Sequence, residues 1–400
     1  MKRLFDHFPV IVITGARQVG KTTLIEHCFS NKVKTITFDP VMDIANARTE
    51  PEYFLQNNPA PLFLDEIQYA PELLGPIKRH VDRQKSTGQY ILSGSQNLSI
   101  LSDVAESLAG RAAVINLMGL SFRELTGSLE KPSLLQRWLK EGTFTLDMLQ
   151  NSTGPENFIR RAFRGGYPGT IDLPQDLLND YWRSYLRTYI ERDVRRTANP
   201  TNLQKFSRFI MLLAALSGHE INYAHLGREL AIDRNTAEAW TEIARATFQW
   251  YTIPAFSKNS IKRIAGKPKG FFADTGFLTY LLSISSPEGI LTHPNHGALF
   301  ETWVFLEVQK HLQEAGMPNA LYHFRTYSGA EVDCVIEHNG RIFLIEIKAT
   351  AQPGKKHTSG FRSFREYFPQ ETIAGELIIC SVPEPLQLSE TCFAVPWWEL

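Results

Sequence analysis

Short apolar runs alternate with helix-length segments in the first third of the chain. The runs are Val10–Thr14, Thr35–Phe38, Leu62–Asp65, Tyr90–Ser93 and Val114–Leu117. Four of them are almost continuously apolar, which is typical of strands in a parallel sheet that helices cover on both faces. The pattern therefore predicts five buried strands in a three-layer α/β domain over residues 1–125.

The pattern changes after about residue 125, where strand-like runs vanish until Ala320. Residues 132–250 have a helical pattern, interrupted at Gly165–Gly169 and at Ala198–Pro200. His338-Asn339-Gly340 is a turn signal between two of the later strands and predicts a hairpin. These later strands are expected at Leu321–Thr326, Glu331–Glu337, Arg341–Lys348 and Glu376–Ser381.

Composition narrows the class of protein. The 400 residues are 43% hydrophobic, which excludes a disordered or fibrous chain. Lys+Arg and Asp+Glu are 42 each, so any nucleic-acid binding must come from local patches. The four cysteines form no C-x-x-C pair, which fits a reducing compartment. With no signal-peptide core and no membrane-length apolar run, we expect a soluble cytoplasmic protein without a membrane partner.

A phosphate-binding loop follows the first predicted strand. The segment fits G-x-x-x-x-G-K-[ST] and opens a helical stretch, so backbone N–H groups and the helix N-terminus would hold phosphates. Lys21 would reach the β- and γ-phosphates, and the Thr22 hydroxyl would bind Mg²⁺. The residues expected to bind ATP here are Gly15, Ala16, Arg17, Gln18, Val19, Gly20, Lys21, Thr22 and Thr23.

Two acids end the third predicted strand. Asp65 and Glu66 follow Leu62–Leu64, which places them at the edge of the sheet where open α/β folds bind ligands. Asp65 would hold Mg²⁺ through water, and Glu66 would polarise the attacking water. Two adjacent acids leaving a strand are also compatible with a solvated turn.

Two further residues are candidates for the same chemistry. Ser95, after the fourth strand, is chosen as the γ-phosphate sensor, with Ser93 and Asn97 as alternatives and a simple turn as the competing interpretation. Arg111 is the best placed basic residue for stabilising transition-state charge. If it acts on a second copy of the chain, the protein must form a multimer. A surface arginine is the competing interpretation.

Together these residues resemble an AAA-type P-loop ATPase. More narrowly, the chain is similar to a widespread prokaryotic ATPase family with a C-terminal domain of unknown function, number 4143. Similar chains usually carry a further helical segment before the first strand that helps cover the adenine, whereas eight residues precede Pro9 here. The resemblance rests on Gly15–Thr23, Leu62–Gln68, Ile91–Ser95, Gly110-Arg111, Leu120–Glu124, Gly165–Pro168, Tyr189–Asp193 and Ala273–Gly276.

A helix-turn-helix pattern lies in the middle of the chain. Helices are expected at Phe206–Leu216, Asn222–Leu230 and Arg234–Phe248, with Asp233 as an N-cap. Two extended runs in Trp250–Phe272 suggest a wing, and the resemblance implies a winged helix. The module could contact DNA through the basic wing or could have a purely structural role. The second alternative is kept because the supposed recognition helix carries two acids, Glu238 and Glu242. The basic wing residues are Lys258, Lys262, Arg263, Lys267 and Lys269.

Charged residues on the last strands have a spacing that suggests a metal site. Because side chains alternate along a strand, Asp333, Glu346 and Lys348 can meet in a hairpin, beside Glu301 on a helix at Gly297–Ala315. The carboxylates would hold Mg²⁺, and Lys348 would orient the attacking water. The arrangement resembles the PD-(D/E)xK nuclease fold, with Asp333, Glu346 and Lys348 at its acid, acid and lysine positions. An amphipathic strand with solvated charges is the competing interpretation.

These observations predict four regions: a P-loop ATPase domain at 1–125, a helical linker at 126–200, a winged helix at 201–285 and a small α+β nuclease-like domain at 286–400. The function expected is Mg²⁺-dependent ATP binding and hydrolysis, coupled to DNA or to a protein partner, including a second copy. The alternative is a non-catalytic nucleotide switch whose C-terminal half only mediates protein interactions.

Overall fold

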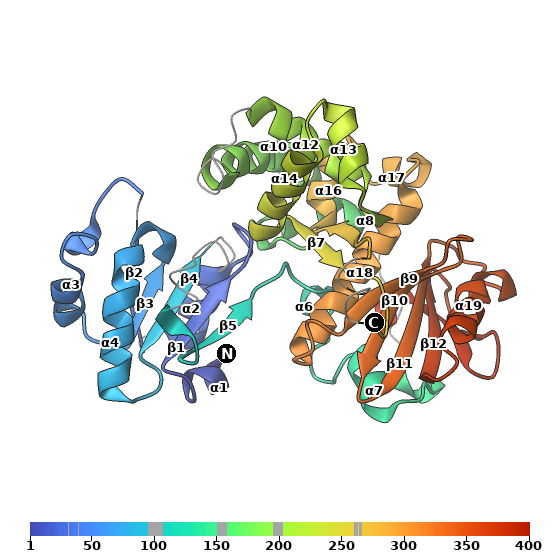
Figure 1. Ribbon diagram of the computed structural model, residues 1–400, viewed down its shortest axis with the longest axis horizontal. Coiled ribbons are helices and arrows are strands. Elements are labelled where there is room, and N and C mark those ends of the chain that lie inside the picture. The colour runs from blue at the N-terminus through green and yellow to red at the C-terminus, as the bar shows by residue number, and fades with distance from the viewer. Residues whose placement is uncertain are drawn as a thin grey trace.

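The computed structural model describes most of the chain (Figure 1). The described residues are 1–30, 32–38, 40–94, 107–149, 158–194, 203–259, 263 and 266–400, except for the side chains of 191–193. Within them, no helix combines the length and the apolar character that crossing a membrane requires.

A five-stranded parallel sheet with strand order β2-β3-β4-β1-β5 forms the N-terminal part of the molecule. Separate apolar clusters on its two faces show three layers, with α3 and α4 on one face and α1 and α2 on the other. The predicted fold class is therefore confirmed for this part. The elements are α1 (Lys2–Phe5), β1 (Val10–Thr14), α2 (Lys21–Phe29), β2 (Lys34–Thr37), α3 (Pro51–Asn57), β3 (Leu62–Asp65), α4 (Leu74–Gln84), β4 (Tyr90–Gly94) and β5 (Ala112–Asn116).

The two edge strands depart from the expectation of five buried strands. Three of the four residues of β2 are exposed. No residue of β5 is fully buried, and Val114 is 56% exposed. An edge strand has a neighbour on one side only, and the helices here cover the centre of the sheet. Burial is therefore complete only in β1, β3 and β4.

The helices after β5 pack against two different parts of the chain, some against the C-terminal sheet and others against the helix that contains Phe277. Trp138 of α7 packs edge-on against Phe343 of the C-terminal sheet, with ring centroids 5.0 Å apart. Trp182 of α10 instead stacks on Phe277 of α16 (Thr275–Leu281), with ring centroids 5.4 Å apart. The region predicted as one helical linker thus contacts both later parts of the chain. Its elements are α6 (Phe122–Thr126), α7 (Leu134–Glu141), α8 (Phe158–Arg164), α9 (Pro168–Ile171) and α10 (Leu178–Thr188), followed by a π-helical turn at Tyr189–Val194.

The predicted helix-turn-helix is present, with a small antiparallel sheet of order β6-β8-β7. Asp233 caps its last helix as expected, accepting a hydrogen bond from the Thr236 backbone N–H at 2.9 Å. Three helices around such a sheet make the arrangement of a winged helix. The elements are α12 (Leu203–Ala215), β6 (His219–Glu220), α13 (Tyr223–Leu230), α14 (Arg234–Ala246), β7 (Trp250–Ile253) and β8 (Lys269–Phe272).

A six-stranded mixed sheet of order β13-β14-β12-β11-β10-β9 forms the C-terminal part, where a small α+β domain was predicted. The predicted hairpin joins β10 to β11, and Asn339 and Gly340 both have the positive φ that its tight turn requires. Helix α18 packs on one face of the sheet and α19 on the other. The elements are α16 (Thr275–Leu281), α17 (Gly289–Thr292), α18 (His296–Glu314), β9 (Leu321–Arg325), β10 (Glu331–His338), β11 (Arg341–Lys348), α19 (Ser359–Tyr367), β12 (Thr372–Cys380), β13 (Leu386–Gln387) and β14 (Cys392–Pro396).

The helical region, the winged helix and the C-terminal sheet share one continuous apolar core. The N-terminal sheet lies to one side and joins this body through the segment after β5 (Figure 1). Ala16 and Val19 of the phosphate-loop motif belong to the shared core rather than to the core of their own sheet. The loop therefore lies where the N-terminal domain meets the rest of the molecule.

Candidate functional site

The motif loop runs from the end of β1 to the start of α2, and its backbone explains both glycines. Gly20 caps α2 in the left-handed conformation, with φ of 90°. A Cβ atom on Gly15 would lie 2.3 Å from the carbonyl oxygen of Leu117, so only glycine fits there. The buried Lys21 ammonium donates to the carbonyl oxygens of Gly15 at 3.0 Å and Ala16 at 2.9 Å. The lysine is thus held inside the loop that would surround a phosphate.

A hydroxyl and a carboxylate meet at the carboxyl edge of the sheet. Thr22 Oγ1 donates to Asp65 Oδ2 at 2.9 Å, and the Ser93 hydroxyl donates to Asp65 Oδ1. Asp65 is 5% exposed, and the sheet register fixes its position at the end of β3. Oxygen ligands of this kind suit Mg²⁺, which is commonly held by one or two protein groups together with waters and phosphates. The residues present therefore fit the cation that the motif predicts.

Glu66 follows in a left-handed conformation, with φ of 57°. Its backbone N–H contacts Asp65 Oδ1 at 3.1 Å and Ser93 Oγ at 3.3 Å, which fixes the turn. The Gln68 side-chain amide donates to Glu66 Oε2. Gln68 was not among the predicted site residues, although it belongs to the Leu62–Gln68 segment. The carboxylate chosen to polarise water is thus already engaged by a neighbour.

The predicted sensor and finger residues have different outcomes. Ser95 and Asn97 lie outside the described residues, whereas the alternative Ser93 contacts Asp65 and Glu66 directly. Arg111 forms a bidentate pair with Asp82 of α4, at 2.6 and 3.0 Å. The hydrogen bond from Arg111 lowers the pKa of the Asp82 carboxyl.

Arg111 also lies at the wrong end of the sheet to serve its own loop. The register pairs Ala112 with Val10, at the start of β1, whereas the loop follows Thr14 at the other end. Parallel strands carry all their amino ends on one edge. Arg111 therefore does not meet the loop of its own chain, and its predicted role at a phosphate loop would require the loop of a second copy.

Besides Ala16 and Val19, the loop approaches the helical region at Gln18 and Gly20. The Tyr181 hydroxyl of α10 donates to Gln18 Oε1 at 2.8 Å. A Cβ atom on Gly20 would be 3.5 Å from Cγ of Pro168, the first residue of α9. The preceding Gly166 is anchored by Asp274 Oδ2, which accepts from its N–H at 2.7 Å. Sequence reasoning identified Gly165–Pro168 by resemblance but assigned it no contact.

The C-terminal charges predicted to meet do so, but with an additional lysine. Lys348 Nζ lies 2.6 Å from Glu346 Oε1 and 3.4 Å from Asp333 Oδ2. Lys269 of β8 lies 2.5 Å from Glu301 Oε1 and 2.9 Å from Asp333 Oδ1. These five residues form the charge cluster. Lys269 was expected in the basic wing, and the apolar Gly-Phe-Phe segment that follows it was the signal for burial.

Electrostatics within the charge cluster follow from its composition. Three carboxylates and two ammonium groups leave one surplus negative charge, so one carboxyl group holds a proton more readily. Burial, followed by the charge of Asp333, raises the pKa of Glu301 to about 8. Lys269 and Lys348 oppose the effect of burial on Asp333 and hold its pKa below the usual value.

The charge cluster does not fit the divalent metal that was expected at Asp333, Glu346 and Glu301. Among the residues that the structure describes, no group of three or more His, Cys, Asp or Glu side chains is arranged to hold a metal ion. The Lys269 ammonium lies between two of the three carboxylates instead.

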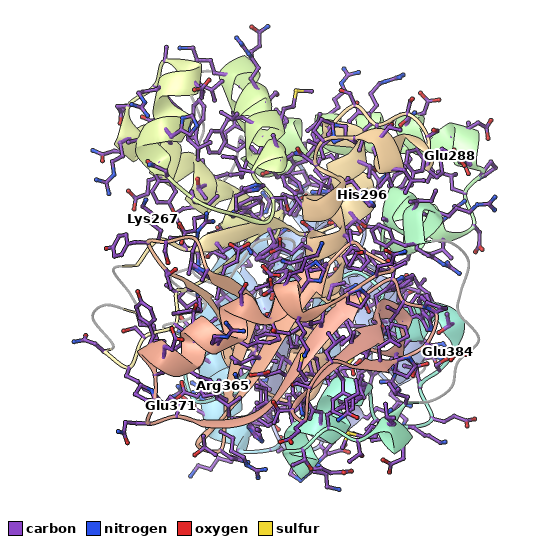
Figure 2. The ribbon with its side chains drawn as sticks, turned by 90° about the vertical axis from the view of Figure 1, so that its right-hand side faces the viewer. Lys267, Glu288, His296, Arg365, Glu371 and Glu384 are labelled. Atoms are coloured by element: carbon purple, nitrogen blue, oxygen red, sulfur yellow. The ribbon has the colours of Figure 1, made fainter. Side chains whose placement is uncertain are left out.

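The basic wing is largely occupied by contacts within the protein. Lys258 pairs with Glu337 at 3.3 Å and Glu371 at 2.7 Å. Arg263 pairs with Glu337 at 3.2 Å, and Lys262 lies outside the described residues. Lys267 is exposed at the edge of the molecule, between the winged helix and the C-terminal sheet (Figure 2).

Comparisons with known proteins agree with the motif assignment. Residues 7–126 match the family model described as an AAA domain. Residues 296–400 match a domain of unknown function, DUF4143, and residues 155–288 match another, DUF8612. Two uncharacterized mycobacterial proteins, Rv2008c of Mycobacterium tuberculosis and Mb2031c of Mycobacterium bovis, are each 28% identical over 99% of this chain and 82% of their own length.

Solved structures resemble the chain only distantly. The Holliday junction branch migration motor RuvB of Thermotoga maritima has a TM-score of 0.28 and 14% identity, over 65% of this chain and 88% of its own. The signal transduction ATPase PH0952 of Pyrococcus horikoshii has a TM-score of 0.25 and 13% identity, over 78% of this chain and 49% of its own.

Proposed function

Because the chain carries an AAA domain and, at its C-terminal end, the domain of unknown function DUF4143, we propose that it is an ATPase that uses Mg²⁺. The observation that carries this proposal is the meeting of Lys21, Thr22 and Asp65 at one edge of the sheet. Loop N–H groups and Lys21 would bind the triphosphate of ATP. Thr22 and Asp65 would hold Mg²⁺, which supplies charge neutralisation at the phosphates.

Glu66 is proposed to polarise the attacking water, once it is released from Gln68. The hydrogen bond between the two side chains engages one Glu66 oxygen. Binding of the γ-phosphate would offer the Gln68 amide a competing acceptor. Gln68 would thereby link the presence of the γ-phosphate to the readiness of Glu66.

The experiment is an ATP-binding and hydrolysis assay on wild type, Lys21→Ala and Glu66→Gln. Lys21→Ala should lose binding, because it removes the charge on the β- and γ-phosphates. Glu66→Gln should keep binding and lose about 10²–10⁴-fold in hydrolysis rate, the usual contribution of a general base. Hydrolysis by Glu66→Gln at the wild-type rate would show that this role is wrongly assigned.

A non-catalytic nucleotide switch is the second candidate. It is favoured by the position of Arg111, which pairs with Asp82 at the amino ends of the strands, at the opposite end of the sheet from the phosphate loop. A single chain thus has a phosphate loop without this arginine. ATP binding with no turnover at any protein concentration would favour the switch.

The partner coupled to ATP is proposed to be a protein rather than DNA. The support is that Lys258, Arg263 and Lys269 of the basic wing are engaged by acids of the C-terminal part. Removal of counterions from DNA requires cations that are free to meet phosphates. An ATPase rate that rises with added DNA, with a steep dependence on salt, would favour DNA instead.

A further inference from the structure

Lys269 is the residue of the charge cluster that comes from outside the C-terminal sheet and α18. We propose that its ammonium group takes the place of a divalent cation among the three carboxylates. The charge cluster is then a metal-independent joint between the winged helix and the C-terminal sheet. This inference is independent of the proposed ATPase function, which uses other residues.

The first support is the position of the ammonium group. Lys269 Nζ lies 2.5 Å from Glu301 Oε1 of α18 and 2.9 Å from Asp333 Oδ1 of β10. It therefore bridges carboxylates from two separate elements, as a bound cation would. The side chain of Lys269 is 7% exposed, so water does not supply these contacts instead.

The second support is that both carboxylate oxygens of Asp333 are already engaged by donors of the protein. Its Oδ1 accepts from Lys269, and its Oδ2 accepts from the backbone N–H of Ile347 at 2.8 Å and from Lys348. Asp333 is 1% exposed. Displacement of the buried Lys269 ammonium or of the Ile347 N–H by a metal would leave that donor unsatisfied, which is costly.

The third support is the charge balance. A dication added to three carboxylates and two ammonium groups would lie beside both lysines and be repelled by them. Two carboxylate oxygens of the charge cluster, Glu301 Oε1 and Glu346 Oε2, are buried without a hydrogen bond of good geometry. The Lys269 ammonium already lies 2.5 Å from Glu301 Oε1, which leaves Glu346 Oε2 as the one of these two atoms without a cation beside it.

The neighbours of Lys269 hold it in this place. Phe271 stacks on Phe305 of α18, with ring centroids 3.8 Å apart and planes at 9°. Gly270 lies under the Trp250 ring, where a Cβ atom would come within 2.1 Å of the indole. Strand β8 is therefore fixed against α18 by packing, and the lysine at its start can only point into the charge cluster.

The test is Mn²⁺ binding by the full-length, nucleotide-free protein, measured as free Mn²⁺ by electron paramagnetic resonance, with melting temperature in parallel. In the wild type, we expect no Mn²⁺ site that depends on Asp333 and no change in melting temperature with EDTA. In Lys269→Ala, we expect a lower melting temperature and one additional Mn²⁺ site per chain. Mn²⁺ should restore part of the lost stability.

Lys267→Ala is the matched control, because it removes an exposed lysine from the same segment and should gain no site. The double variant Lys269→Ala with Asp333→Asn should lose the gained site. Lys269→Ala or Lys269→Gln that folds but binds no more Mn²⁺ than the control would overturn the proposal. If neither variant folds, the wild type still decides: Mn²⁺ bound by wild type and lost in Asp333→Asn would overturn it.

Discussion

At the scale of single residues, the candidate site depends on a few side chains and backbone angles that permit no substitute. Gly15 has φ of 148° and no room for a Cβ atom against Leu117. The Asp65 carboxylate accepts hydrogen bonds from the hydroxyls of both Thr22 and Ser93. In the charge cluster, by contrast, Lys269 bridges Glu301 and Asp333, and Lys348 contacts Asp333 and Glu346.

Gly15→Ala should weaken ATP binding and lower stability by roughly 1–3 kcal/mol, the usual cost of forcing a methyl group into a closed space. The physical reason is the 2.3 Å approach to the Leu117 carbonyl, which would push the loop from its path. Equilibrium denaturation and ATP titration measure the two effects. Gly354→Ala, where a Cβ atom meets nothing within 4 Å, is the control.

Glu301→Gln should flatten the dependence of stability on pH. The folded-state pKa of Glu301 is raised to about 8 from an ordinary 4.5, so the folded protein holds this proton more tightly than the unfolded chain. Its effect on stability is then most favourable below pH 4.5 and is lost as pH rises toward about 8. Glutamine has no proton to lose.

Melting temperatures of wild type and Glu301→Gln between these two pH values measure this effect. The wild type should lose stability across the window, whereas the variant should change less. A variant whose melting temperature falls as steeply as that of wild type would place the titrating group elsewhere.

At the scale of elements, the start of α9 and the side of α10 lie against the phosphate loop. The contacts are the Tyr181 hydroxyl with Gln18 and Pro168 with Gly20. The Gly165–Gly169 segment is in turn anchored to Asp274, the N-cap of α16. A movement of the loop on nucleotide binding would therefore displace α9 and α10 and the side chains packed between them.

Tyr181→Phe should weaken this mechanical link while leaving the loop itself intact. A hydrogen bond contributes about 1 kcal/mol, so ATP affinity should change by less than roughly tenfold. We expect ATP to alter amide hydrogen exchange in α9 and α10 of wild type, and to do so much less in the variant. Tyr53→Phe, at an exposed position of α3, should behave as wild type.

At the scale of the whole molecule, the edges of the N-terminal sheet decide how hydrolysis could be completed. The loop lies at the carboxyl ends of the parallel strands, and Arg111 lies at their amino ends. Strand β5 is the outermost strand on its side of the sheet and is partly exposed. An arginine that reaches a phosphate loop from there must belong to a second copy. Self-association would then be part of catalysis.

Arg111→Ala should reduce hydrolysis, and mixing it with Lys21→Ala should restore part of the rate. In a mixed assembly, the intact loop of the first variant can meet the intact arginine of the second. Arginines of this kind contribute roughly 10³–10⁵-fold, so even partial restoration is measurable. A wild-type rate per chain that does not change with concentration, together with no restoration on mixing, would exclude this arrangement.

The sequence by itself determined the features that are contiguous along the chain. The loop from Gly15 to Thr22, the acids ending β3, the hairpin turn at Asn339-Gly340 and the cap at Asp233 depend on local backbone geometry, which a few adjacent residues dictate. The alternation of β10 and β11 was equally readable, because the side-chain period of a strand is two. For that reason Asp333, Glu346 and Lys348 were placed together correctly.

The tertiary structure alone decided what those residues meet. Lys269 reaches Asp333 across 64 positions of sequence, and Tyr181 reaches Gln18 across 163. The pairing of Arg111 with Asp82 likewise joins the start of β5 to α4. Neither periodicity nor a local motif encodes such contacts, because they arise when packed elements bring distant side chains together. The nature of the C-terminal charge cluster therefore followed from the packing of β8 against α18.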